Sequence, residues 1–227
     1  MSRILVINPN SSTTMTEDIH DTVLRFKPEG WQFDVIRIEK SPLVLESFTD
    51  YTLAGANVLD YLEENDLSGY DGILLACFGD PCLWALKEQV SIPVIGIAEA
   101  SISLALLLGY KYSIIAAVPK AKAMMESLVR SYGMEDRMAS VEELNVEICT
   151  FMEQKQLLEE AALSCGKRAI EKGAEVLILG CAGMTILGDD AAKKLEVPVI
   201  DPIKAGLGTL KSIIDGGFSI SKACLFS

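Results

Sequence analysis

The sequence predicts an α/β protein made of two similar halves, each built on a parallel β-sheet. Short apolar runs alternate with segments of helical periodicity along the whole chain. Most of these runs are apolar at every position, which is typical of parallel strands that helices cover on both faces. An internal repeat relates the two halves and is the third observation behind this prediction.

The first half begins with alternating strands and helices. Its expected strands read RILVINP (3–9), WQFDVIRI (31–38), GILLAC (72–77) and IPVIGI (92–97). The expected helices between them cover 12–26, 49–64 and 81–90.

The second half follows the same plan. A helix is expected over 102–108, another after Pro119, and a long one over 150–172. A last helix, 203–214, is expected to return to the first half. The predicted domains are therefore 1–98 with 203–227, and 99–202. The expected strands read YSIIAAV (112–118), EVLILGC (175–181) and VPVID (197–201).

The internal repeat aligns the third strand of each half. In both, an apolar strand ends in Cys-X-Gly, a short helix follows, and then comes Pro-Val-Ile. Cys77 and Cys181 are 104 positions apart, and Pro93 and Pro198 are 105 apart, so one gap aligns them. The first strands agree less well, with proline just past each strand end, at 9 and 119.

Composition excludes several classes of partner. Half of the residues are hydrophobic and the net charge is −12. An acidic chain without a basic cluster is a poor candidate for binding nucleic acid or an anionic membrane surface. The apolar run at 4–7 is too short for a signal peptide, and Gly109 and Lys111 interrupt the most hydrophobic region before it reaches the length of a membrane span. We expect a cytoplasmic protein whose partner is a small-molecule substrate.

The sequence lacks the residues that a metal site or a serine hydrolase would need. His20 is the one histidine in the sequence, it lies in a helical pattern, and no CxxC pair is present. The sequence therefore predicts no metal site. Six cysteines spread over a chain of this length and cytosolic character are expected to be thiols.

Cys77 and Cys181 end equivalent strands, and ligands of open α/β sheets bind beyond the carboxyl ends of strands. Two halves related by a pseudo-twofold axis would bring these thiols to opposite sides of one cleft. Inverting a carbon centre needs a base on one face and an acid on the other, so the pair fits two-base proton transfer. Asp80-Pro81 fits an N-cap followed by the first residue of a helix. Such a helix start favours a thiolate.

The residues beside the two cysteines support this chemistry. Gly79 and Gly183 would let the backbone approach a ligand, and nearby N–H groups would stabilise an enolate oxygen. Cys82, one helical turn after Cys77, is interpreted as a packing residue, with a regulatory disulfide to Cys77 as the alternative. The remaining thiols, at 149, 165 and 224, are expected to be inert core residues.

Four segments together resemble the aspartate/glutamate racemase superfamily, and most closely its hydantoin and allantoin racemase branch. They read INPNSS (7–12), ACFGDP (76–81), PVIGIAEAS (93–101) and LGCAGM (179–184). The resemblance implies racemisation without a cofactor, with Cys77 and Cys181 as the acid/base pair. It also implies flavodoxin-like halves with the active site between them, and a homo-oligomer.

The residues after the cysteines bear on the substrate. Amino-acid racemases of this superfamily carry Cys-Asn-Thr and Gly-Cys-Thr, whereas this chain has Cys-Phe-Gly and Cys-Ala-Gly. A neutral ring such as a 5-substituted hydantoin or allantoin fits such surroundings better than an amino acid. Asn8 and Ser11 or Ser12 would bind ring groups, with helix capping as their alternative role. The predicted substrate-binding residues are Asn8, Ser12, Phe78, Gly79, Val118, Ala182 and Gly183.

The sequence departs from the branch at three positions. Val44 and Ser47 stand where serine and glycine are expected in a loop after the second strand, and Cys82 stands where glycine is usual. Alternatives are an amino-acid racemase and a maleate isomerase-like enzyme of the same superfamily. Arylmalonate decarboxylase-like members use one cysteine, so two matched cysteines argue against them. The non-enzyme alternative is a small-molecule-binding module.

Overall fold

The computed structural model describes residues 2–117, 119–144 and 155–226. Contacts between Cα atoms divide the chain into two compact units. Unit 1 comprises Met1–Ile97 and Ile203–Ser227, and unit 2 comprises Ala98–Pro202.

Unit 1 holds a four-stranded parallel sheet with the strand order β2-β1-β3-β4. β1 and β3 are buried along nearly their whole length, which explains their apolar sequences. The strands are β1 (Arg3–Asn8), β2 (Gln32–Arg37), β3 (Gly72–Leu75) and β4 (Val94–Gly96). The helices are α1 (Thr13–Phe26), α2 (Phe48–Glu64), α3 (Leu83–Gln89), α8 (Pro202–Asp215) and the 3₁₀-helix η4 (Cys224–Phe226).

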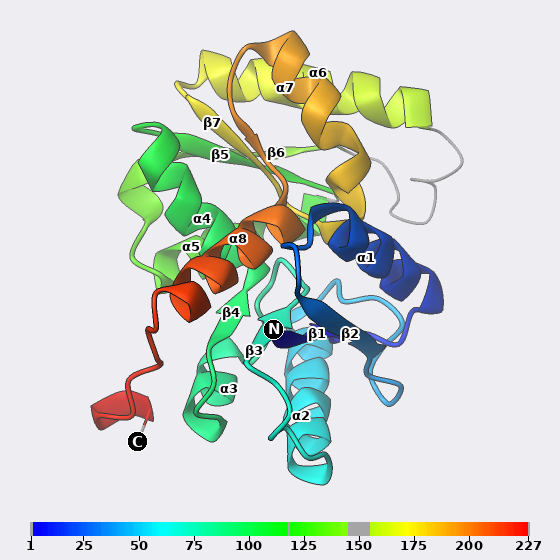
Figure 1. The fold of residues 1–227 in the computed structure, drawn as a ribbon. Helices are drawn as coiled ribbons and strands as arrows, with labels where there is room; N and C mark the ends of the chain where they lie inside the picture. The colour runs from blue at the N-terminus through cyan, green and yellow to red at the C-terminus, as the bar shows by residue number, and fades with distance from the viewer. Residues whose placement is uncertain (1, 118, 145–154, 227) are drawn as a thin grey trace. The chain divides into compact units, whose positions relative to one another are not determined.

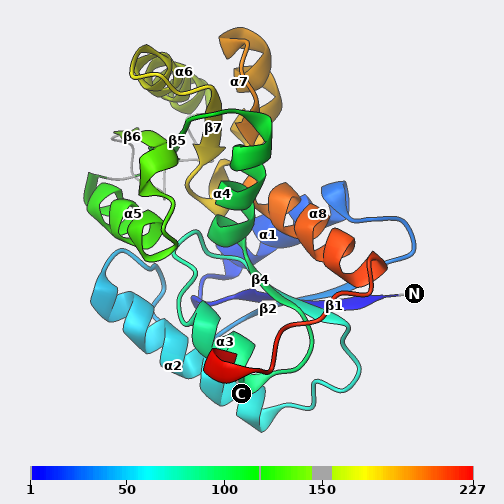
Figure 2. The ribbon, with the colours of Figure 1, turned by 90° about the vertical axis from the view of Figure 1, so that its left-hand side faces the viewer.

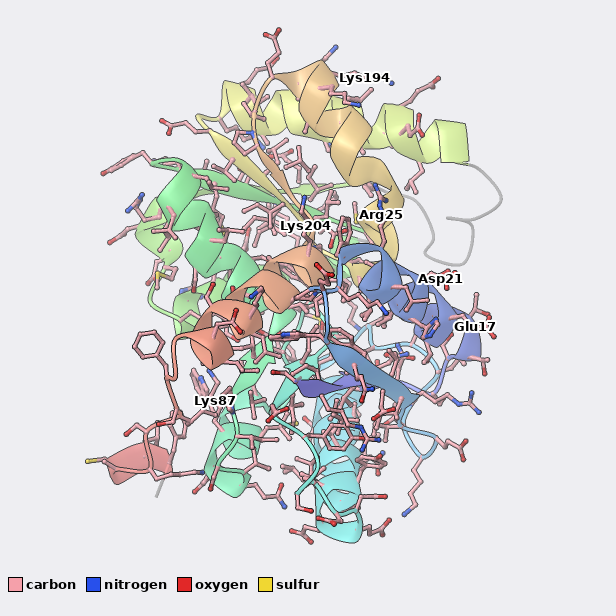
Figure 3. The ribbon with its side chains drawn as sticks, viewed as in Figure 1. Glu17, Asp21, Arg25, Lys87, Lys194 and Lys204 are labelled. Atoms are coloured by element: carbon pink, nitrogen blue, oxygen red, sulfur yellow. The ribbon has the colours of Figure 1, made fainter. Side chains whose placement is uncertain are left out.

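Helices cover both faces of this sheet. Within unit 1, α1 and α8 lie on one face and α2 and α3 lie on the other (Figures 1 and 2). Gly72 of β3 lies directly under α8, because an ideal Cβ on it would be 3.0 Å from Cδ1 of Leu210. The outer face of α1 is charged, with Glu17, Asp21 and Arg25 at four-residue spacing (Figure 3). The helix thus has the amphipathic pattern of a layer that packs on a sheet.

Unit 2 repeats this architecture with the strand order β6-β5-β7-β8, again parallel throughout. α5 packs on β5 and β6, and α6 packs on β5, β6 and α7. The strands are β5 (Tyr112–Ala116), β6 (Met138–Glu143), β7 (Val176–Leu179) and β8 (Val199–Ile200). The helices are α4 (Ile97–Leu108), α5 (Pro119–Ser131), η1 (Glu135–Arg137), α6 (Lys155–Glu171), η3 (Ala182–Leu187) and α7 (Gly188–Leu195).

The two sheets correspond at the level of single hydrogen bonds. The N–H of Ile73 donates to the carbonyl of Pro93 at 2.8 Å, and the N–H of Leu177 donates to the carbonyl of Pro198 at 2.9 Å. The donors are 104 positions apart and the acceptors 105 apart, as the sequence repeat requires. Two units with one strand order and one hydrogen-bond pattern confirm the prediction of two similar α/β halves. The pseudo-twofold relation between them stays a prediction.

The first strands of the two units are related by a different offset from the third strands. Equivalent hydrogen bonds pair Ile7 with Ile115, which are 108 positions apart. Pro9 therefore corresponds to Ala117, and Pro119 lies two residues further along. The two prolines therefore do not occupy equivalent positions, in keeping with the weaker agreement of the first strands in the sequence.

One missed strand and two helix starts also differ from the sequence predictions. β6 is a strand that the apolar pattern did not indicate, because its outer residues are only half-buried. α4 begins at Ile97, directly after β4, and not at 102. α3 begins at Leu83 and not at 81, for reasons given below. None of the helices in the described ranges combines the length and apolar character that crossing a membrane requires.

Candidate active site

Cys77 follows the carboxyl end of β3 by two residues. The N–H of Ala76 still bonds the carbonyl of Ile7 on β1, at 2.8 Å, so the ladder ends one residue before the cysteine. Cys77 then opens a four-residue turn in which the N–H of Asp80 donates to the Cys77 carbonyl at 3.0 Å. The residue is half-buried and its sulfur is not part of a disulfide.

Cys181 occupies the equivalent place in unit 2. The N–H of Gly180 bonds the carbonyl of Ile115 on β5, at 2.9 Å, and ends the ladder one residue before Cys181. The N–H of Met184 then donates to the Cys181 carbonyl at 3.1 Å and closes a turn of the same length. Cys181 is also half-buried and outside any disulfide. Each sheet thus presents a thiol at the first position of a turn beyond its third strand.

The strand order makes this edge a candidate for ligand binding. In each sheet the chain runs from the central strand to one side and returns to the other, so the order reverses between β1 and β3, and between β5 and β7. Ligands of open α/β sheets bind beyond the strand carboxyl ends at such a point. Cys77 follows β3 and Cys181 follows β7, so both thiols lie at a switch point.

The turn after Cys77 leaves backbone donors available. The N–H groups of Phe78 and Gly79 make no hydrogen bond within the described part of the chain. The Phe78 side chain is buried, with 4% of its surface exposed, and Ala182 is buried to a similar degree. Any contact of these residues with a substrate would therefore run through the backbone.

A neighbouring side chain leaves no space for a Cβ at residue 79. An ideal Cβ at this position would lie 2.3 Å from Cε2 and Cζ of Tyr51, on α2, and 2.5 Å from its Oη. The Tyr51 ring therefore occupies the side-chain position of Gly79, and the expectation that the Gly79 backbone approaches a ligand stays a prediction. No motif pointed to Tyr51, and its position beside the turn emerges only from the fold.

The expected N-cap at Asp80-Pro81 does not form. Asp80 has φ 42° and a buried side chain, and it lies where a Cβ on Gly96 would be, 2.3 Å from Cγ of Asp80. The N-cap of α3 is Cys82, whose side chain makes no capping bond. Cys77 therefore precedes a turn and not the first turn of an α-helix, and Cys181 precedes the 3₁₀-helix η3.

Cys82 is a packing residue with unusual backbone geometry. Its φ is 56°, in the left-handed region that favours glycine, which accounts for the glycine that the resemblance leads one to expect here. The thiol is accommodated because α2 has Gly55 opposite, where a Cβ would lie 3.0 Å from Cβ of Cys82. Burial raises the pKa of Cys82 to about 12, so the thiol stays protonated at neutral pH.

The loop after β1 uses most of its polar groups internally. Asn8 is 1% exposed, and its amide nitrogen donates to Oδ1 of Asn10 and to Oγ1 of Thr16, both at 2.9 Å. Ser12 is the N-cap of α1 and accepts from the N–H of Met15 at 3.2 Å. These are the capping and loop roles that the sequence left open beside substrate binding.

The loop before α2 closes the same edge of unit 1. The N–H of Ser11 donates to the carbonyl of Pro42 at 3.1 Å. Ser47, which replaces an expected glycine, caps α2 by accepting from the N–H of Asp50 at 3.1 Å. Val44, which replaces an expected serine, is exposed.

The other expected residues fall in varied places. Cys165 is buried and donates to the carbonyl of Glu143 at 3.0 Å, and burial raises its pKa, as suits an inert core thiol. Cys224 is exposed on η4, so its prediction as a core residue was wrong, because the apolar residues around it lie on the surface of the C-terminal segment. Val118 and Cys149 lie outside the described residues.

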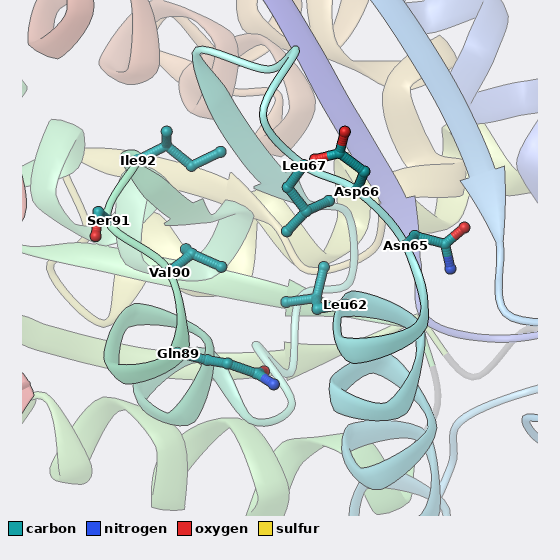
Figure 4. A pocket seen from close by; sticks show the side chains of 8 residues that line it. All are labelled: Leu62, Asn65, Asp66, Leu67, Gln89, Val90, Ser91 and Ile92. Carbon is teal, nitrogen blue, oxygen red and sulfur yellow. The ribbon is translucent and has the colours of Figure 1, made fainter.

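A pocket of about 330 Å³ lies at the opposite end of unit 1 (Figure 4). Its lining comes from the segments that precede β3 and β4, whereas Cys77 follows β3, so it is separate from the thiol edge. Within the described ranges, no group of three or more metal-binding side chains is assembled. The pocket is lined by Leu62, Asn65, Asp66, Leu67, Gln89, Val90, Ser91 and Ile92.

Sequence comparison decides the family. The family model described as Asp/Glu/Hydantoin racemase matches residues 4–210. The chain belongs to this family. A hydantoin racemase from Pseudomonas sp. (strain NS671) is 35% identical over 221 residues, which are 97% of this chain and 89% of the relative. A hydantoin racemase from Paenarthrobacter aurescens is also 35% identical, over 223 residues, which are 97% of this chain and 94% of the relative.

Structural comparison agrees with the family. The solved structure of allantoin racemase from Klebsiella pneumoniae matches with a TM-score of 0.93 and 30% identity, covering 100% of this chain and 93% of that one. This member of the Asp/Glu/Hydantoin racemase family is therefore an isomerase of the racemase type. Its α/β fold with two similar units is the fold of that structure.

Proposed function

We propose that this family member is a cofactor-independent racemase of a cyclic ureide, such as a 5-substituted hydantoin or allantoin, with Cys77 and Cys181 as a two-base pair. The observation that carries the proposal is the equivalent position of the two thiols. Each follows the third strand of its sheet by two residues and opens a hydrogen-bonded turn. Relatives named hydantoin racemase and allantoin racemase support the class of substrate.

The proposed reaction proceeds through one planar intermediate. The thiolate of one cysteine takes the proton from the chiral carbon, and the electron pair of the broken C–H bond moves into the adjacent carbonyl to give an enolate. The thiol of the other cysteine then gives its proton to the opposite face of that carbon. The pair ends with its protonation reversed, and the reverse reaction or exchange with water restores it. This mechanism requires the carboxyl edges of both sheets to face one substrate.

Groups at these edges suit the enolate and the ring. The N–H groups of Phe78 and Gly79 are available to donate to a developing oxyanion. The Ser12 oxygen accepts a bond from α1 and keeps its own hydrogen for a ring carbonyl. Asn8 has both amide hydrogens in use, so any contact with the ring would be through its oxygen.

The substrate is proposed to be neutral because of the residues that follow the thiols. Phe78 and Ala182 are buried apolar side chains, each followed by a glycine, and offer no side-chain amide or hydroxyl to an amino-acid carboxylate or ammonium group. A hydantoin ring instead presents carbonyl and N–H groups that backbone amides can match. The acidity of its ring C–H bond also reduces the help that the protein must supply.

The direct test incubates each enantiomer of a 5-substituted hydantoin, and of allantoin, with the protein in D₂O. We expect loss of optical rotation together with deuteration at the chiral carbon. Cys77→Ser and Cys181→Ser should each lower inversion by about 100-fold or more. Each should still exchange deuterium into one enantiomer, and the two variants should favour opposite enantiomers. Cys224→Ser, at an exposed thiol, is the matched control and should invert like wild type.

Two results would overturn the proposal. Absence of both exchange and inversion with every ring substrate, together with ligand-induced thermal stabilisation, would indicate a binding module. Full inversion activity in Cys77→Ser would refute the two-base assignment. A homo-oligomer and a cytoplasmic location stay predictions, and light scattering on the purified protein tests the first of them.

A further inference from the structure

The second turn of α2 packs against the turn that begins at Cys77. The ring edge of Tyr51 lies where a side chain at 79 would be, 2.3 Å from an ideal Cβ on Gly79. Ordinary contacts between carbon atoms are about 3.5–4.0 Å, so no Cβ fits here while the ring keeps its place. Gly79 is the third residue of the turn that the Asp80–Cys77 hydrogen bond closes. Tyr51 therefore supports this turn from outside.

A second contact joins the same helix face to the same loop. Gly55 lies four residues after Tyr51, so both are on one face of α2. A Cβ on Gly55 would lie 3.0 Å from Cβ of Cys82. The last ladder hydrogen bond before this loop is made by Ala76. Beyond it, the loop contacts Tyr51 at its middle and Gly55 at its end.

We propose that Tyr51 is a positioning residue of the racemase reaction, which holds the turn so that the Cys77 thiol reaches the chiral carbon. The inference rests on the proposed function, in which Cys77 is one of two proton-transfer groups. Proton transfer depends steeply on distance, and a displacement of about 1 Å can cost about 100-fold in rate. The Tyr51 ring edge beside the Gly79 backbone opposes movement of the turn toward α2.

The first test separates positioning from general destabilisation. In Tyr51→Ala, inversion requires the displaced Cys77 and should fall by about 100-fold. Deuterium exchange into the enantiomer whose hydrogen faces Cys181 requires only Cys181, and should fall by less than about tenfold. Tyr51→Phe keeps the ring edge and should restore inversion. Tyr61→Ala, a tyrosine ten residues further along α2, is the matched control and should keep the wild-type ratio of exchange to inversion.

The second test is a double-mutant cycle with Gly79→Ala. In the wild-type background the added methyl group meets the Tyr51 ring, so inversion should fall by about tenfold or more. In the Tyr51→Ala background the ring is absent, and the same change should cost little further activity. Such non-additivity is the signature of two groups in direct contact.

The outcomes distinguish this inference from the proposed function. A wild-type protein without exchange or inversion refutes the racemase proposal, and the positioning role falls with it. With an active wild type, parallel loss of exchange and inversion in Tyr51→Ala refutes the positioning role alone. Equal costs of Gly79→Ala in both backgrounds refute it as well.

Discussion

Alkylation kinetics should show that Cys82 is not a reactive partner of Cys77. Burial raises the pKa of Cys82 to about 12. At pH 8 such a thiol is ionised to about one part in 10,000, whereas a thiol with an ordinary pKa of about 8.5 is about one quarter ionised. The fraction of reactive thiolate is therefore about 2,500-fold lower for Cys82.

Greater intrinsic reactivity offsets part of this difference. A thiolate becomes more nucleophilic as its pKa rises. With a Brønsted coefficient of about 0.4–0.5, a pKa difference of about 3.5 units makes the Cys82 thiolate about 25–60-fold more reactive than the reference thiolate. We therefore expect iodoacetamide to alkylate Cys82 about 40–100-fold more slowly than a small reference thiol whose pKa is about 8.5. Limited access in the folded protein would slow it further.

The assay is timed alkylation of the native protein at pH 8, followed by mass spectrometry of the peptides. Cys224 is exposed and should be labelled early, which confirms that the reagent is active. Labelling of Cys82 at the rate of the reference thiol would refute the packing role. A disulfide between Cys82 and Cys77 after mild oxidation would refute it as well, because the contact with Gly55 would then have to be broken.

Three further predictions concern stability. Cys82→Gly should relieve about 1 kcal/mol of left-handed strain and lose packing of similar size, so the thermal midpoint should change little while inversion persists. Glu142→Gln should lower the free energy of unfolding by about 1 kcal/mol at neutral pH, measured by urea titration, because the half-exposed side chains of Lys172, at 2.6 Å, and Arg168 lose a charged partner. Burial opposes the charge on Glu142, but hydrogen bonds from Lys172, Ser140 and Arg168 outweigh it and lower the pKa of Glu142. The difference in unfolding free energy between wild type and variant should therefore shrink as the pH falls below about 4. Gly180→Ala should cost about 1–3 kcal/mol, measured the same way, because its Cβ would lie 2.7 Å from the Ile115 carbonyl oxygen.

The sheets could be predicted from sequence because buried parallel strands must be apolar on both faces. β1, β3, β5 and β7 obey this rule and were found. β6 was missed because it is an edge strand with half-buried residues and a buried carboxylate, Glu142. Arg168 and Lys172 pair with that carboxylate in the fold and offset the cost of its burial, and hydropathy does not register such pairing. The start of α4 was missed because no turn residues separate it from β4.

The site was predictable where local sequence controls the backbone and not where tertiary contacts do. The Cys-X-Gly repeat located both thiols because strand ends are local features. Asp80-Pro81 resembles a helix cap, yet packing against Gly96 holds the aspartate side chain inside the unit. The proposed role of Tyr51 depends on the absence of a side chain at Gly79. Neither residue, taken alone in the sequence, therefore predicts the contact.

The turns that begin at Cys77 and Cys181 have different surroundings. Thermodynamics limits the effect of this difference on the kinetic constants of the two enantiomers. Enantiomers have equal free energies, so the equilibrium constant of racemisation is one, and kcat/KM must be equal in the two directions for every variant. In the proposed mechanism, displacing Cys77 alone must therefore lower kcat/KM for both enantiomers by the same factor, even though Tyr51 contacts the Cys77 turn. The asymmetry can appear in kcat and KM separately, and in deuterium exchange without inversion, because exchange from one face needs only one thiol. Isotope exchange is thus the measurement that would assign each cysteine of the proposed pair to a face of the substrate.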